Sequence, residues 1–182
     1  MAKEEKTKAS LIIAKNKENN GKNFEENSLI EVGKSAPLFS LPSDDGDISI
    51  SELKGKNIVL YFYPKDDTPG CTIEAQDFTK NIDKFIDMDC VIIGVSKDSI
   101  TSHCKFIEKY KIAFNLLSDA DGEVCKKFDV IKEKSMFGKK YQGIDRSTFL
   151  INKIGKISAI WRSVSVKGHI EQVLKELNKI SK

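Results

Sequence analysis

The chain has 182 residues, which is enough for one domain with a sizeable hydrophobic core and too few for two. Hydrophobic residues make up 40% and charged residues 31% of the chain, an ordinary balance for a soluble globular protein. The formal net charge is +3, and the lysines are scattered among acidic residues. The charge pattern therefore predicts neither a nucleic-acid-binding nor a membrane-binding surface.

The N-terminal part of the chain divides into a tail and a hairpin. Residues 1–28 are rich in Lys, Glu and Asn without a sustained apolar period, so we expect a flexible polar tail there and one folded domain over residues 29–182. Prolines frame Ala36–Pro42 as a short edge strand. A turn at Asp44–Asp47 and the alternating segment Ile48–Ile50 complete a predicted β-hairpin.

The remaining elements follow from continuous apolar runs, which indicate buried strands, and from apolar residues spaced three and four apart, which indicate helices. In chain order they are the strand Asn57–Tyr63, the helix Cys71–Phe85, the strand Cys90–Val95, the helix Ser99–Lys111, the strand Asn115–Leu117, the helix Val124–Phe128, the strands Ser147–Ile151 and Lys156–Trp161, and the helix Gly168–Ile180. We expect Asp98 to be the N-cap of the second helix.

This order of strands and helices is typical of a thioredoxin-like α/β fold, in which helices flank a central mixed sheet and a hairpin precedes it. In open α/β sheets, sites form beyond the carboxyl ends of the strands. The loop from Pro64 to Cys71 follows the first central strand. We therefore expect the chemistry of this protein in that loop.

Cys71 stands where the loop ends and a helix begins. At that position the unpaired amide groups of the first turn and the positive end of the helix dipole favour a thiolate over a thiol. A thiolate that attacks a peroxide also needs hydrogen-bond donors for the departing oxygen. The Thr68 hydroxyl, the amide groups near Gly70 and a guanidinium can supply them. The alternative is that Cys71 is an inert buried thiol.

The four cysteines do not form a metal site or a dithiol pair. No two of them have CxxC spacing, and no zinc-ligand pattern is present, so we predict neither a metal nor another cofactor. The sequence shows no secretory signal and no apolar stretch of transmembrane length. We therefore expect a cytoplasmic protein with free thiols.

The segment Pro64–Ala75, P-K-D-D-T-P-G-C-T-I-E-A, resembles the PxxxTxxC active-site signature of peroxiredoxins. With the preceding Y-F-Y it is similar to the bacterioferritin comigratory protein, or Q-type, branch of that family. Five further stretches resemble this branch, so that the similarity runs from about residue 32 to the C-terminus: APLFSLP, GVSKDSITSHCKF, LLSD, FGKKYQGIDRSTFLI and the pair Gly168-His169. The resemblance implies a thiol-dependent peroxidase that reduces hydrogen peroxide and organic hydroperoxides in antioxidant defence.

The resemblance also implies a role for each residue that matches the signature. Cys71 is the expected peroxidatic cysteine, which attacks the peroxide and becomes a sulfenic acid. Thr68 is expected to hydrogen-bond the peroxide, and Pro64 to shield the sulfenate. Arg146 is expected to polarise the substrate and the thiolate, and Glu74 to orient that arginine. The only other arginine, Arg162, is expected on the surface.

The sequence departs from the branch at the resolving cysteine. The two positions where members carry this cysteine are Gln76 and Ile107 here. We therefore expect a one-cysteine mechanism, in which thioredoxin, glutaredoxin or a small thiol reduces the sulfenate of a monomer or weak homodimer. Cys104, one turn before Ile107, is the alternative resolving partner. Cys90 and Cys125 are expected to pack in the core.

Two other functions stay open at this point. A Cys–His hydrolase would pair Cys71 with His103 or His169, although nothing in the sequence places either histidine beside the loop. A non-catalytic holdase or binding module on the same fold would leave Cys71 inert.

Overall fold

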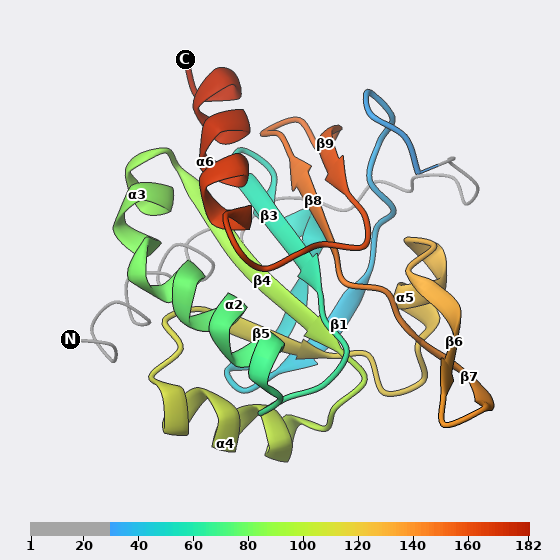
Figure 1. Ribbon diagram of the computed structural model, residues 1–182. Coiled ribbons are helices and arrows are strands. Elements are labelled where there is room, and N and C mark those ends of the chain that lie inside the picture. The colour runs from blue at the N-terminus through green and yellow to red at the C-terminus, as the bar shows by residue number, and fades with distance from the viewer. Residues whose placement is uncertain (1–29) are drawn as a thin grey trace.

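The computed structural model describes residues 30–182, and the predicted tail, residues 1–28, lies outside the described residues. Within that range seven strands form one mixed sheet in the order β2-β1-β5-β4-β3-β8-β9 (Figure 1). Their bounds are β1 Ser40–Ser43, β2 Gly46–Ser49, β3 Asn57–Phe62, β4 Cys90–Ser96, β5 Asn115–Ser118, β8 Ser147–Ile151 and β9 Ile157–Trp161. A mixed sheet with an N-terminal hairpin on one side is the arrangement that the sequence predicts.

β3 is an interior strand of the sheet, and its whole length is buried. It pairs in parallel with β4 and antiparallel with β8. Successive side chains of a strand point to opposite faces, so Leu60 joins the core on one face and Tyr61 joins the core on the other. Full burial of an aliphatic or aromatic side chain contributes about 2 kcal/mol. Burial on both faces explains why this segment is apolar without alternation.

Helices cover the two faces of the sheet unequally. Four helices pack on the face that carries Tyr61: α2 Pro69–Lys80, α3 Ile82–Asp87, α4 Ile100–Tyr110 and α6 His169–Ile180 (Figure 1). The short helices η1 Ile50–Leu53 and α5 Glu123–Lys127 pack on the opposite face. Cys71 belongs to the four-helix face.

The predicted helix Cys71–Phe85 is wrong in its extent. The helix begins two residues earlier, at Pro69, and breaks at Asn81, whose ψ of 10° separates α2 from α3. The Asn81 side chain donates to the carbonyl oxygen of Asp77 at 2.9 Å. Asparagine side chains compete in this way with main-chain hydrogen bonds and interrupt helices.

Asp98 is not the N-cap of α4. Ser99 has this role, and its hydroxyl accepts a hydrogen bond from the Ser102 amide at 3.2 Å. The Asp98 carboxylate instead accepts from the Ser96 hydroxyl and from the main-chain amide of Asp66. Asp98 thus joins the end of β4 to the loop before α2.

A second hairpin, β6 Ile131–Met136 and β7 Lys139–Ile144, is absent from the predicted elements. It forms a separate two-stranded sheet that projects beside α5 (Figure 1). Both residues of its turn have positive φ, 51° at Phe137 and 76° at Gly138, as a two-residue hairpin turn requires. The strands are mostly exposed, so the sequence carries no apolar alternation to reveal them.

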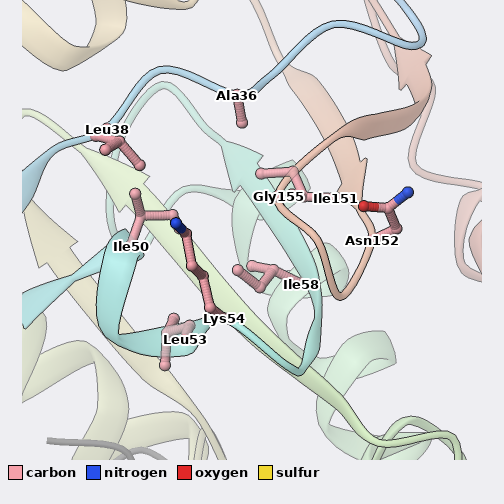
Figure 2. A pocket seen from close by; sticks show the side chains of 9 residues that line it. All are labelled: Ala36, Leu38, Ile50, Leu53, Lys54, Ile58, Ile151, Asn152 and Gly155. Atoms are coloured by element: carbon pink, nitrogen blue, oxygen red, sulfur yellow. The ribbon is translucent and has the colours of Figure 1, made fainter. Parts of the chain in front are cut away.

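A small hollow, with room for about 20 Å³, lies where the N-terminal segment crosses the sheet (Figure 2). Its lining is mostly aliphatic and comes from the N-terminal segment, η1, β3 and the β8–β9 turn: Ala36, Leu38, Ile50, Leu53, Lys54, Ile58, Ile151, Asn152 and Gly155. The buried side chains among them belong to the core on the face opposite Cys71. The hollow is therefore separate from the Pro64–Cys71 loop.

Candidate active site

Cys71 is the third residue of α2, which starts directly after the loop that follows β3. Thr68 precedes the helix with extended backbone, and its carbonyl oxygen accepts the amide of Thr72 at 2.9 Å. Pro69 suits the first helical position because that position needs no amide donor. The Cys71 thiol therefore lies beside the amino end of α2, and only 2% of the residue is exposed.

Arg146 reaches Cys71 because of the sheet register. It directly precedes Ser147, which pairs with Phe62 at the carboxyl end of β3. This register places the arginine next to the loop, although 75 positions separate it from Cys71 in sequence. Its Nη2 donates to Cys71 Sγ at 3.3 Å, and its carbonyl oxygen is fixed by the amide of Val164 at 2.9 Å.

Glu74 holds the other side of the guanidinium. It lies one turn after Cys71 in α2, its side chain is fully buried, and its Oε2 accepts from Arg146 Nη1. Burial raises the pKa of Glu74 to about 7, and Arg146 opposes this rise. Burial also works against the charge of Arg146, but Glu74 and Cys71 together raise the pKa of the guanidinium. The guanidinium is thus charged and bonded at both ends.

Gly70 leaves space for this guanidinium. A Cβ atom at Gly70 would lie 3.1 Å from Arg146 Nη2, closer than an ordinary van der Waals contact. Glycine is disfavoured inside helices by about 0.5–1 kcal/mol relative to alanine. Its presence in the first turn of α2 is therefore explained by the approach of Arg146.

Thr68 and Pro64 lie in the same loop, but neither forms a hydrogen bond with the sulfur of Cys71. The Thr68 hydroxyl donates to the carbonyl oxygen of Lys65 at 2.8 Å, and no side chain of the described residues caps α2. The first amide groups of the helix are therefore left for another acceptor. Pro64 is exposed directly after the buried Tyr63.

The remaining cysteines occupy two kinds of position. Cys90 and Cys125 are buried, as expected, and burial raises the pKa of both thiols far above its usual range. Such thiols are poor nucleophiles because only the thiolate reacts. Cys104 is exposed on α4.

Both histidines are buried, and the structure places one of them beside the loop, which nothing in the sequence indicated. His103 Nδ1 is 2.8 Å from Oδ2 of Asp66, a residue of the loop. His169 Nε2 is 2.8 Å from the Thr148 hydroxyl, and burial, with a contribution from Arg146, lowers the pKa of His169 to about 4. Within residues 30–182 neither histidine hydrogen-bonds Cys71, so the geometry provides no Cys–His pair.

Arg162 is not a loose surface residue. Its Nη1 donates to the carbonyl oxygens of Phe128 and Asp129 at 3.0 and 2.7 Å, and its guanidinium lies 5.1 Å from the ring centre of Phe149. These contacts fix the chain just after α5. The sequence offers no signal for the two hydrogen bonds, because their acceptors are main-chain atoms more than 30 positions away.

Comparisons of the whole chain with known proteins agree with one another. Residues 32–160 match the AhpC/TSA family. Peroxiredoxin Bcp of Bacillus subtilis is 50% identical over 153 residues, which cover 84% of this chain and 98% of that protein. A structure of Peroxiredoxin Q from Xanthomonas campestris is 44% identical with a TM-score of 0.76, and it covers 79% of this chain and 92% of that one.

Two further solved structures add detail. PrxQ of Xylella fastidiosa superposes with a TM-score of 0.80 at 38% identity, over 86% of this chain and all of that one. A bacterioferritin comigratory protein of Xanthomonas campestris, described for its alkyl peroxide reduction activity, is 40% identical with a TM-score of 0.77, over 84% of this chain and all of that one. The chain therefore belongs to the AhpC/TSA family, as a thiol peroxidase among its Bcp, or Q-type, peroxiredoxins.

Proposed function

We propose that this thiol peroxidase reduces hydrogen peroxide and organic hydroperoxides through a sulfenic acid on Cys71. The observation that carries the proposal is the contact of Arg146 Nη2 with Cys71 Sγ at the amino end of α2. A charged donor and a helix end both favour the thiolate, which is the nucleophile of such a reaction. The alkyl peroxide activity of the Xanthomonas relative supports the inclusion of organic hydroperoxides.

In the proposed reaction the Cys71 thiolate attacks one oxygen of the hydroperoxide. An S–O bond forms, the O–O bond breaks, and the other oxygen leaves with the electron pair and takes up a proton as water or alcohol. Arg146 and the free amide groups of the first turn stabilise the negative charge of the departing oxygen. Glu74 holds Arg146 in place, Thr68 hydrogen-bonds the peroxide, and Pro64 limits the access of water to the sulfenate.

We further propose that an external thiol, rather than a second cysteine of the chain, reduces the sulfenate. Cys90 and Cys125 are buried, and burial keeps both as thiols, so neither is favoured as the cysteine that resolves the sulfenate. Cys104, on the exposed side of α4, is the alternative. Thioredoxin, glutaredoxin or a small thiol would act as the reductant, and we place the enzyme in the cytoplasm as a monomer or weak homodimer.

The test compares Cys71→Ser with Cys104→Ser, the same change at an exposed cysteine. We expect Cys71→Ser to lose peroxide reduction and Cys104→Ser to keep it. After one equivalent of hydrogen peroxide, intact mass spectrometry should show a dimedone adduct on Cys71 in the wild type. Turnover in a folded Cys71→Ser variant would refute the role of Cys71. A mass loss of two hydrogens that disappears in Cys104→Ser would show that Cys104 resolves the sulfenate.

A further inference from the structure

Besides Glu74 in α2, the site has a second buried acid, Asp66, in the loop before this helix. The reaction described above does not use Asp66. Its Oδ1 accepts from the Tyr63 hydroxyl at 2.7 Å, and its Oδ2 accepts from the Ser102 hydroxyl at 2.7 Å. His103 Nδ1 lies 2.8 Å from the same Oδ2. The Asp66 amide donates to Asp98 at 2.9 Å. Asp66 thus joins the loop to the end of β3, to the end of β4 and to α4.

The neighbouring acid, Asp67, contacts the same helix in a different environment. It accepts hydrogen bonds from Lys109 and from Tyr110, near the carboxyl end of α4. Both partners of this ion pair are about half exposed. Exposed ion pairs contribute little to stability, whereas each buried hydrogen bond to a charged group contributes several times more. Asp66 is therefore the main attachment of the loop to α4.

This attachment opposes one step of the reaction. A peroxide is small, but a thiol reductant has to bring its sulfur into line with the sulfur of Cys71. Cys71 lies in the first turn of α2 and is only 2% exposed, and the guanidinium of Arg146 is bonded to its sulfur. A loop that moved away from α4 would uncover this sulfur for a thiol.

We propose that Asp66 is a positioning residue, whose buried bonds to Tyr63, Ser102 and His103 hold the loop closed over Cys71 and thereby set how often it opens to the reductant. This inference rests on the proposed role of Cys71. In the closed loop the sulfenic acid can meet a second peroxide, whose O–O bond breaks to give a sulfinic acid and water or alcohol. In the open loop a thiol attacks the sulfenic sulfur, forms an S–S bond and releases water.

Weakening the attachment should therefore favour the thiol reaction over the second oxidation. Asp66→Asn keeps the shape of the side chain but removes its charge, and charge-assisted hydrogen bonds are about twice as strong as neutral ones. We expect the open population to rise about tenfold, which corresponds to about 1.4 kcal/mol. Because the closed loop still predominates, the first reaction with peroxide should change by less than about twofold.

The matched control is Asp67→Asn, the same change one residue later with exposed partners. Each variant is oxidised with one equivalent of hydrogen peroxide and mixed with dithiothreitol, and the decay of the sulfenic acid is followed by rapid quench and mass spectrometry. We expect the decay to be about tenfold faster in Asp66→Asn and unchanged in Asp67→Asn. The sulfinic acid formed per turnover should fall by a similar factor in Asp66→Asn alone.

Alkylation of Cys90 and Cys125 reports whether a variant has loosened as a whole. Equal rates of sulfenic acid decay in Asp66→Asn and the wild type would overturn the proposal. So would alkylation of Cys90 and Cys125 that becomes faster by the same factor as alkylation of Cys71. If Asp66→Asn does not fold, Ser102→Ala removes one of the three side-chain partners, and it should speed the decay about threefold. A wild-type Cys71 that forms no sulfenic acid would instead refute the proposed function.

Discussion

Glu74 is a carboxyl group whose burial has a measurable consequence for stability. In the native protein the pKa of Glu74 is raised from 4.5 to about 7 by burial. Between these two pH values the native state binds more protons than the unfolded state, so the free energy of unfolding falls as the pH rises. The stabilising contribution is fully present below about pH 4.5 and is lost as the pH passes through 7. A shift of this size corresponds to roughly 3 kcal/mol.

Glu74→Gln removes this titration and keeps the shape of the side chain. Urea unfolding at several pH values between 4.5 and 8 gives the free energy of unfolding for both proteins. We expect the stability of Glu74→Gln relative to the wild type to increase by roughly 3 kcal/mol over this range. Glu108→Gln, a change at an exposed glutamate of α4, controls for the loss of one negative charge. Parallel curves for Glu74→Gln and the wild type would show that burial does not govern the protonation of Glu74.

Three further substitutions test other contacts of the structure. Arg146→Lys should slow the reaction of Cys71 with hydrogen peroxide by about tenfold or more in rapid-quench assays. One ammonium group cannot bond both the thiolate and Glu74 as a planar guanidinium does. A rate within twofold of the wild type would contradict this. Gly70→Ala should slow the same reaction, because the added methyl group displaces Arg146. The midpoint of thermal unfolding should stay unchanged or rise, since alanine favours the helix. An unchanged rate would show that the guanidinium adjusts freely. Arg162→Met should lower the free energy of unfolding in urea by about 1–2 kcal/mol through its lost carbonyl contacts, with the peroxide rate unaffected.

Burial and local signals made much of the fold predictable. The apolar segment of β3, the periodic helices and the position of Cys71 at a helix start all depend on residues close together in sequence. Two features that were predicted wrongly, the end of α2 and the N-cap of α4, depend on side chains that have more than one possible hydrogen-bond partner. Asn81 breaks a helix by bonding a nearby carbonyl oxygen, and Asp98 bonds a distant amide instead of capping α4. Periodicity carries no information about such choices.

The site shows the same division. The sequence by itself determined that a cysteine would stand at the start of a helix, beyond the carboxyl end of a buried strand, because these features arise within one short segment. Only the tertiary structure decided which groups surround that sulfur. The pairing of β8 with β3 brings Arg146 to Cys71 across 75 positions, and the packing of α4 brings His103 to Asp66 across 37. Contacts of this kind depend on the packing of the whole sheet, and no local pattern specifies them.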